Sequence, residues 1–133
     1  MTLSVRALDH LVLTVADMDR TIGFYTDVLG MAHAPFTAGD GSVRHALGFG
    51  DQKINLHQAG AEFEPKARVA TPGSADLCFL TDGAMADWLE HLSEKGVVVE
   101  QGPVPRTGAT GPILSVYMRD PDGNLIEVSL PDA

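Results

Sequence analysis

The feature that most constrains the fold of this chain is an internal repeat. Two landmarks of the first half recur at one offset in the second half: Asp76 follows His10 by 66 residues, and Gly96 follows Gly30 by 66 residues. In each half an apolar, strand-like run leads into a helical pattern that ends at the glycine, and three further strand-like segments follow. Self-similarity of this length indicates two copies of one supersecondary unit. We therefore expect two βαβββ modules.

The elements of each module follow from hydrophobic periodicity and turn residues. Asp17 is a good N-cap for the first helix, and Thr81 or Asp82 is expected to cap the second. The core residues of the second helix are expected to be Met85, Trp88 and Leu92. Strands are expected at about residues 8–15, 31–37, 43–50, 52–58, 75–80, 97–102, 112–119 and 124–130.

These elements predict the α+β class, with two modules that form a half-open, eight-stranded barrel. We expect one domain over residues 1–133, with modules at 4–58 and 74–130 and a polar connector at 59–73. The six extra residues of the second half are placed in a Gly/Pro-rich loop at 103–112. Each sheet has its helix on one face and, because sheets twist, a concave inner face on the other. Such a concave face is the usual place for a small ligand.

Composition excludes several classes of partner. The net charge of −9 argues against nucleic acid, because phosphate binding needs a basic patch. The single cysteine, Cys78, rules out an internal disulfide and is expected to be a buried, inert thiol. No basic-then-apolar leader and no apolar run of about 20 residues is visible, so we expect a cytoplasmic protein with no membrane partner.

Alternation along the strands assigns polar residues to the inner face. His10 and Asp76 lie there in the first strand of each module, and Glu127 lies there in the last strand. In the matching strand of the first module the inner residue is Asn55, with His57 two positions on. Imidazole nitrogen and carboxylate oxygen suit Zn, Ni, Mn, Fe or Co. A lone strand histidine is more often a packed residue than a ligand, but the pairing through the repeat favours a divalent metal.

Three stretches of the chain resemble the hallmarks of the vicinal oxygen chelate superfamily. They are residues 8–15, residues 24–31 and the Asp-Pro-Asp-Gly-Asn turn with the strand after it, at residues 120–127. That superfamily includes glyoxalase I, extradiol dioxygenases, fosfomycin resistance enzymes and bleomycin resistance proteins. Residues 50–57, 62–67 and 102–109 look much like the group of glyoxalase domain-containing protein 5 and its bacterial relatives.

The resemblance implies the paired fold and a metal on the inner face. His10 matches the first-strand histidine ligand, and Glu127 matches the last-strand glutamate ligand. Asp76 stands where the superfamily usually has a histidine, and Asn55 stands where glyoxalases have a glutamate. These departures make the usual ligand set doubtful, and His57 is a candidate for the missing imidazole. Whether Asp76 coordinates the metal or orients a ligand histidine is left open.

Four residues are candidates for contact with the substrate. Tyr117 matches a substrate-contacting tyrosine of the fosfomycin resistance enzymes and shares a predicted strand face with Arg119. Arg106, on the Gly/Pro-rich loop, is a candidate to close over an anionic group, although a solvated loop charge is the competing interpretation. Asn55 is the fourth candidate. Glu127, Asp76 and Tyr117 are the candidate catalytic residues.

The leading hypothesis is a metal-dependent lyase or isomerase that chelates a small polar or anionic substrate through neighbouring oxygens. A second hypothesis is a non-haem iron dioxygenase in which His10, His57 and Glu127 hold the iron. A third is a metal-free protein that binds a small molecule, as bleomycin resistance proteins do. A homodimer is expected. The half-open barrel is formed either by the two modules of one chain or by modules from two chains.

Overall fold

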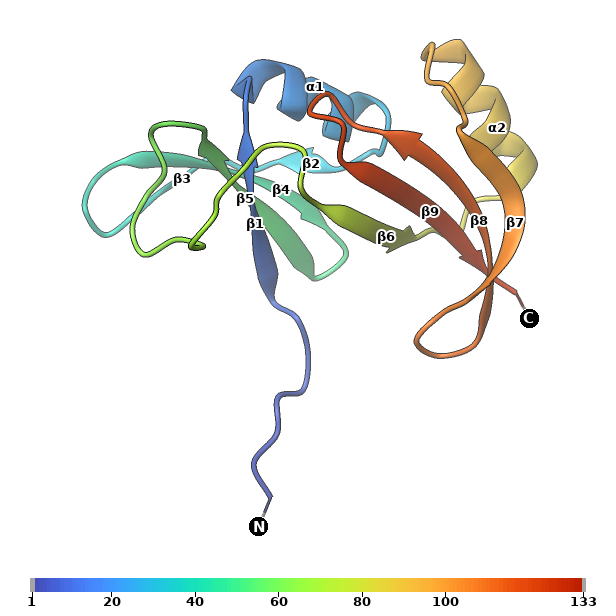
Figure 1. Ribbon diagram of the computed structural model, residues 1–133, viewed down its shortest axis with the longest axis horizontal. Helices are drawn as coiled ribbons and strands as arrows, with labels where there is room; N and C mark the ends of the chain where they lie inside the picture. Colours follow the sequence, from blue (N-terminus) through green and yellow to red (C-terminus); the bar gives the residue numbers. More distant parts are fainter. Residues whose placement is uncertain (1, 133) are drawn as a thin grey trace. The chain divides into compact units, whose positions relative to one another are not determined.

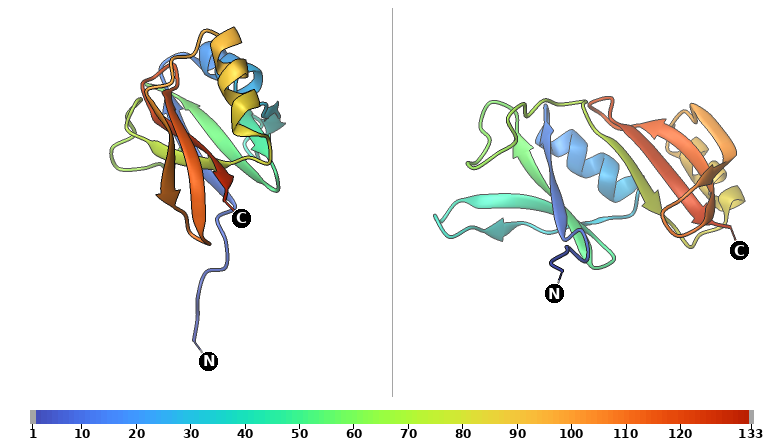
Figure 2. Two further views of the ribbon diagram at one scale, coloured as in Figure 1. Left: turned by 90° about the vertical axis from the view of Figure 1, so that its right-hand side faces the viewer. Right: turned by 60° about the horizontal axis from the view of Figure 1, so that its bottom comes forward.

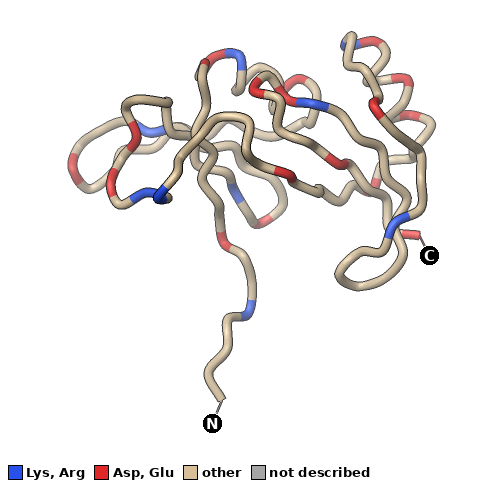
Figure 3. Tube along the Cα trace, in the orientation of Figure 1, with Lys and Arg blue, Asp and Glu red and all other residues tan. Residues whose placement is uncertain are grey.

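The computed structural model describes residues 2–132, and the chain divides after Thr71 into two compact units. Each unit holds one sheet and one helix (Figure 1, Figure 2). Lys and Arg are scattered among the more numerous Asp and Glu, and no long run of basic residues occurs in the described trace (Figure 3). No helix within residues 2–132 has the length and apolar character that a membrane crossing requires.

The first unit follows the predicted βαβββ order, with its second strand broken into two short pieces. Its sheet has the order β1-β5-β4-β2, and β3 also pairs with β4. The first and last strands, β1 and β5, run parallel. The helix leads from β1 to β2, and the two antiparallel pairings of β4 give β2 and β5 the same direction. The elements are β1 His10–Val15, α1 Met18–Asp27, β2 Ala32–His33, β3 Phe36–Thr37, β4 Val43–Phe49 and β5 Gln52–Gln58.

Local chemistry sets the limits of α1. The carboxylate of Asp17 accepts a hydrogen bond from the backbone N–H of Arg20 at 3.0 Å, which confirms the predicted N-cap. After the helix, Gly30 takes a φ of 71°, a left-handed conformation that lets the chain turn back towards the sheet. The buried core of this unit includes Tyr25 of the helix and Leu13, Val15, Leu47, Ile54 and Leu56 of the strands.

The second unit repeats the plan. Its sheet has the order β6-β9-β8-β7, with β6 and β9 parallel and the other pairs antiparallel. Its buried core includes Met85 and Leu92 of the helix and Val116, Met118, Ile126 and Val128 of the strands. The elements are β6 Asp76–Leu80, α2 Met85–Glu94, β7 Gln101–Thr107, β8 Pro112–Arg119 and β9 Leu125–Pro131.

The turn before β9 fixes the parallel pair. Asp120 Oδ1 accepts the backbone N–H groups of Asp122 and Asn124, both at 2.9 Å. The side chain of Asn124 donates to Asp120 Oδ2 at 2.8 Å and accepts the backbone N–H of Ala75 at 2.8 Å. This confirms the tight turn expected from Asp-Pro-Asp-Gly-Asn. It also ties the start of β9 to the start of β6.

Several predicted elements were wrong in detail. β7 occupies 101–107 instead of 97–102, so Arg106 lies on a strand and only residues 108–111 form the loop. The prolines that suggested a loop are tolerated because β7 is an edge strand. The expected strand at 31–37 splits into β2 and β3, which gives nine strands rather than eight.

The start of α2 and the burial of Trp88 also differ from expectation. The N-cap of α2 is Ala84, which makes no side-chain cap hydrogen bond. Thr81 instead stays outside the helix, where its hydroxyl accepts Trp88 Nε1–H at 2.9 Å and the N–H of Gly83 at 3.1 Å. Trp88 is therefore partly exposed, while Met85 and Leu92 are buried as predicted.

Candidate functional site

The inner face of the second sheet gathers most of the predicted site residues. The antiparallel register places Tyr117 of β8 opposite Glu127 of β9, and Ser115 opposite Ser129. On the other side of β9, the parallel register places Cys78 opposite Glu127. Because side chains alternate, these residues share one face, and the apolar residues between them pack on the opposite face.

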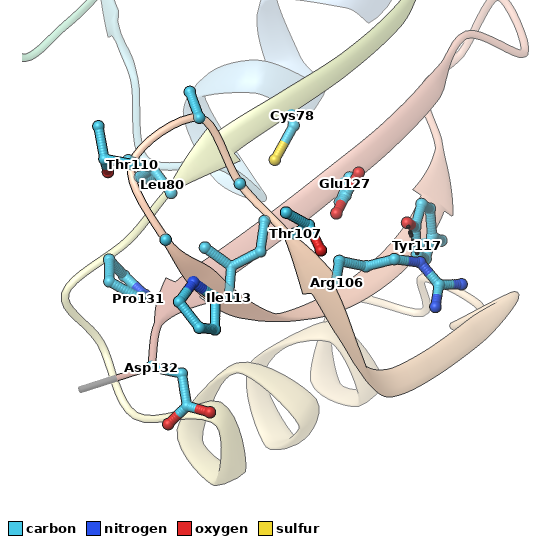
Figure 4. Close-up of a pocket in the computed structure, with 14 residues that line it drawn as sticks. Cys78, Leu80, Arg106, Thr107, Thr110, Ile113, Tyr117, Glu127, Pro131 and Asp132 are labelled. Atoms are coloured by element: carbon cyan, nitrogen blue, oxygen red, sulfur yellow. Dashed lines mark hydrogen bonds between the residues drawn. The ribbon is translucent and has the colours of Figure 1, made fainter.

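A pocket of about 580 Å³ lies on this inner face (Figure 4). Its polar lining includes Arg106, Tyr117 and Glu127, and its apolar lining includes Leu80 and Ile113. A second hollow of about 480 Å³ shares those three polar residues and adds Asp76, Glu100, Gln101, Arg119 and Leu125. Arg106, Tyr117 and Glu127 therefore stand where the two hollows meet.

The carboxylate of Glu127 is held on one side by two serines. Ser115 Oγ donates to Glu127 Oε2 at 2.6 Å, and Ser129 Oγ lies 3.3 Å from the same oxygen. Both hydroxyl contacts end on Oε2, so Oε1 lies outside the serine pair and is the oxygen left for a ligand.

Arg106 is held against Tyr117 at the wall of the pocket. Its Nε donates to the Tyr117 hydroxyl at 2.9 Å, and its Nη1 donates to the carbonyl oxygen of Pro105 at 3.1 Å. The guanidinium carbon lies 5.4 Å from the centroid of the Tyr117 ring. Two contacts fix the guanidinium plane, and its remaining N–H groups are available to an anion.

Arg119 and Asp76 belong to the second hollow. Arg119 Nε lies 2.8 Å from Glu100 Oε2, and Arg119 Nη1 donates to the carbonyl oxygen of Gly123 at 3.2 Å. This salt bridge is about half exposed and stabilises the fold little. Together with a 3.4 Å contact from Nη2 to Glu100 Oε1, these bonds engage all three guanidinium nitrogens of Arg119. Asp76 is exposed on the wall of the hollow.

Cys78 is exposed, and the expectation that it is buried was wrong. β6 is the edge strand of its sheet, so only β9 covers Cys78 from the side. Partial burial of the thiol raises its pKa, while a hydrogen bond with Ser129 acts in the opposite direction and the charge of Glu127 adds to the rise. A thiol that keeps its proton is a poor nucleophile, as the sequence indicated.

In the first unit, His10 has the arrangement of a metal ligand supported by a carboxylate. Its Nδ1 lies 2.8 Å from Asp9 Oδ1, and its side chain is 43% exposed. A hydrogen bond from Nδ1–H to a carboxylate orients the ring and leaves the lone pair on Nε2. Nε2 is then the nitrogen that would bind a cation.

His57 is buried, with 8% of its surface exposed. Its ring meets the Phe63 ring edge-on, with the two ring centroids 5.5 Å apart. The guanidinium carbon of Arg44 lies 3.9 Å from the centroid of the same Phe63 ring. Burial lowers the pKa of His57, and the positive charge of Arg44 lowers it further. His57 is therefore kept neutral, which is the form that binds metals.

Asn55 leaves a polar atom without a partner. Its Oδ1 is buried and has no hydrogen bond among the described residues. The register places Asn55 between Val12 of β1 and Ala46 of β4, neither of which carries a polar side chain. An unsatisfied buried oxygen costs about 1–3 kcal/mol.

The candidates are divided between the two units. The first unit holds His10, Asn55 and His57, and the second holds Asp76, Arg106, Tyr117, Arg119 and Glu127. Within residues 2–132 no three His, Cys, Asp or Glu side chains are gathered as a metal site. Taken singly, His10 Nε2 and Glu127 Oε1 are donors of the kind that a divalent metal needs. The shared site of His10, His57, Asp76 and Glu127 stays a prediction.

Sequence reasoning missed three supporting groups. Asp9 behind His10, Phe63 against His57 and the serine pair behind Glu127 were not assigned a role. Ser129 lies two residues after Glu127, so strand alternation places it on the same face, and that signal was available in the sequence. The contact between Phe63 and His57 had no signal in the strand pattern, because Phe63 lies in a loop.

Comparison with known proteins identifies the family to which this chain belongs. The model of the "Glyoxalase/Bleomycin resistance protein/Dioxygenase superfamily" matches residues 7–128. This chain belongs to that superfamily. The assignment confirms the resemblance seen in the sequence and the α+β fold of two βαβββ modules. The likeness to the group of glyoxalase domain-containing protein 5 stays a prediction.

Individual superfamily members support the assignment. Glyoxalase domain-containing protein RDO1 of Mycosarcoma maydis is 62% identical over 127 residues, which span 96% of this chain and 69% of that protein. The integron cassette protein VCH_CASS1 from the mobile metagenome of V. Cholerae is 56% identical, with a TM-score of 0.93 over 99% of this chain and all of its own. Lactoylglutathione lyase from Agrobacterium tumefaciens is 26% identical, with a TM-score of 0.70 over 96% of this chain and 95% of its own.

Proposed function

We propose that this superfamily member is a metal-dependent enzyme of the lyase or isomerase type, acting on a small anionic substrate. The observation that carries the proposal is the arrangement around Glu127. One carboxylate oxygen is held by buried serines, the other is left for a ligand, and the Arg106–Tyr117 pair stands at the same junction. A similarity to lactoylglutathione lyase supports an enzyme of this class.

His10 and Glu127 would hold the metal, with His57 and Asp76 as the further candidate ligands. When bound, a divalent metal supplies Lewis-acid stabilisation of negative charge on substrate oxygens. Each proposed ligand is prepared for this role by its own surroundings: Asp9 orients His10, and burial keeps His57 neutral. Asn55, whose Oδ1 has no hydrogen bond among the described residues, is a further candidate of the first unit for contact with a substrate.

The residues of the second unit bind and orient the substrate. The guanidinium of Arg106 binds its anionic group through the N–H groups that Tyr117 and Pro105 leave free. The Tyr117 hydroxyl accepts from Arg106 and keeps its own proton, which it can donate to a substrate oxygen. Glu127 or Asp76, whichever is displaced from the metal, would serve as the base. Arg119 would act as a secondary contact for the anion.

Metal content of two variants tests the proposal. We expect His10→Ala and Glu127→Ala each to lose most of the metal that the unaltered chain retains on gentle purification, because loss of one ligand usually abolishes tight binding. Glu94→Ala, an exposed carboxylate at the end of α2, is the matched control and should keep its metal. Full metal content in both ligand variants, measured by elemental analysis, would contradict the assignment.

The same measurement separates the competing functions. Iron together with oxygen uptake on catechols would favour a dioxygenase with His10, His57 and Glu127 as ligands. Zn, Ni or Mn without oxygen consumption would eliminate the dioxygenase. Less than about a tenth of a metal per chain would instead favour a metal-free binding protein, since tight sites survive gentle purification.

A further inference from the structure

Two hydroxyl groups are buried in the sheet beneath the carboxylate of Glu127. Ser115 and Ser129 face one another across β8 and β9, and both have 0% of their surface exposed. The next residues along this face, Ile113 and Pro131, are apolar. Burying a hydroxyl costs free energy unless the group is hydrogen-bonded. Two buried hydroxyls side by side therefore need a hydrogen-bond acceptor, and the carboxylate of Glu127 is that acceptor.

The hydrogen bonds run in one direction. An ionised carboxylate only accepts, and a serine hydroxyl has one proton to give. The 2.6 Å contact therefore takes the proton of Ser115 to Glu127 Oε2. The 2.7 Å contact between the two hydroxyls must then use the proton of Ser129, which the longer 3.3 Å contact from Ser129 to Glu127 Oε2 can only share. In the last contact, 3.2 Å between Cys78 Sγ and Ser129 Oγ, the thiol must be the donor, because the proton of Ser129 is already used.

We infer that Ser115 and Ser129 are positioning residues that fix the orientation of the Glu127 carboxylate, with one oxygen against the sheet and the other toward the pocket. Rotation of the carboxylate away from its observed plane would break the 2.6 Å hydrogen bond and leave the buried proton of the Ser115 hydroxyl without its acceptor, although the 2.7 Å contact with Ser129 would remain. Oε2 is therefore held against the sheet, and Glu127 would bind a metal as a monodentate ligand through Oε1. This inference rests on the proposed function, because the ligand of Oε1 is the proposed metal.

The test measures Co²⁺ binding to the full chain, by titration for affinity and by visible absorption for coordination. We expect Ser115→Ala to weaken Co²⁺ binding by about 10–100-fold, the usual effect of removing a partner that orients a ligand, and to change the absorption spectrum. Ser129→Ala acts on Glu127 mainly through Ser115 and should have a smaller effect in the same direction. Ser115→Thr, which restores the hydroxyl, should recover part of the affinity.

Val116→Ala is the matched control. Val116 is also fully buried on β8, but it points to the opposite face, so its loss should lower the melting temperature without changing the Co²⁺ affinity. If Val116→Ala and Ser115→Ala weaken binding equally, the serines are only structural and the inference is overturned. If Ser115→Ala fails to fold, Ser129→Ala and Ser115→Thr carry the same comparison.

Failure of this inference can be told apart from failure of the proposed function. Unaltered affinity and spectrum in Ser115→Ala and Ser129→Ala, with binding lost in Glu127→Ala, would overturn the positioning role and leave the metal site standing. Unaltered binding in Glu127→Ala, or no Co²⁺ binding by the original chain, would overturn both.

Discussion

Replacement of Gly102 by alanine should destabilise the second unit strongly. Gly102 lies at the irregularity in β7 between Gln101 and Val104, where the register with β8 shifts. Its φ is +108°, a conformation that alanine rarely adopts. An added Cβ would collide with the carbonyl oxygen of Ser115 and would lie 3.0 Å from Val116 Cα. Both obstacles are backbone atoms of the adjacent strand, so neither can turn aside.

The expected loss of stability is about 3 kcal/mol. A positive φ costs an alanine about 1–2 kcal/mol, and forced overpacking typically costs about 1–3 kcal/mol. The lower entropy of the unfolded alanine chain offsets about 0.4–1 kcal/mol of this. For a chain of this size the remainder corresponds to a fall in melting temperature of about 10 °C. Displacement of the Ser115 backbone should also weaken metal binding, because Ser115 holds Glu127.

Urea unfolding followed by circular dichroism measures the change. Gly23→Ala is the matched control, because Gly23 lies in α1 with nothing within 4 Å of the added Cβ and without a positive φ. Alanine is the better helix former, so this control should gain about 0.5–1 kcal/mol. A Gly102→Ala variant within about 1 kcal/mol of the original chain would refute the reasoning, since the strain at positive φ alone reaches that value.

Two further predictions concern buried polar groups of the first unit. Thr21 is 1% exposed, and its hydroxyl has no partner among the described residues, so Thr21→Val should raise the free energy of unfolding by about 1 kcal/mol; a loss of stability on urea unfolding would contradict this. Burial lowers the pKa of His57 below 6.5 in the folded chain, so below pH 6.5 the unfolded chain takes up a proton first. Stability should therefore be fully present above pH 6.5 and fall as the pH drops towards the lower pKa, and His57→Gln should flatten this slope. Identical slopes in the two proteins, from unfolding curves at pH 5 to 8, would show that His57 does not contribute.

Strand alternation predicted the faces of the site residues, because the period of two is a local property. The inner face of β9 carries Glu127, as expected, and the side chain of Asp120 closes the expected turn at residues 120–124. Alternation could not show that Ser115 lies 2.6 Å from Glu127, since that distance depends on the register between two strands. It also gave no measure of exposure at a sheet edge, which is why Cys78 was expected to be buried.

The wrong predictions in the second module concerned residues whose structural preference depends on their tertiary surroundings. Pro103 and Pro105 indicate a loop in most contexts, but an edge strand accepts them. Thr81 is a good cap by type, but its hydroxyl is occupied by Trp88 and Gly83, so the helix begins later. The position of a strand in its sheet and the partner of a hydroxyl are both tertiary facts.

The prolines of β7 also affect how the folded chain behaves in a crowded solution. A sheet edge normally exposes a row of amide donors that can recruit a strand from another molecule. β7 lacks two of these donors, at Pro103 and Pro105, so this border is a poor template for edge-to-edge aggregation. The strand that carries Arg106 thus protects the sheet from uncontrolled growth while holding a charged side chain at the pocket.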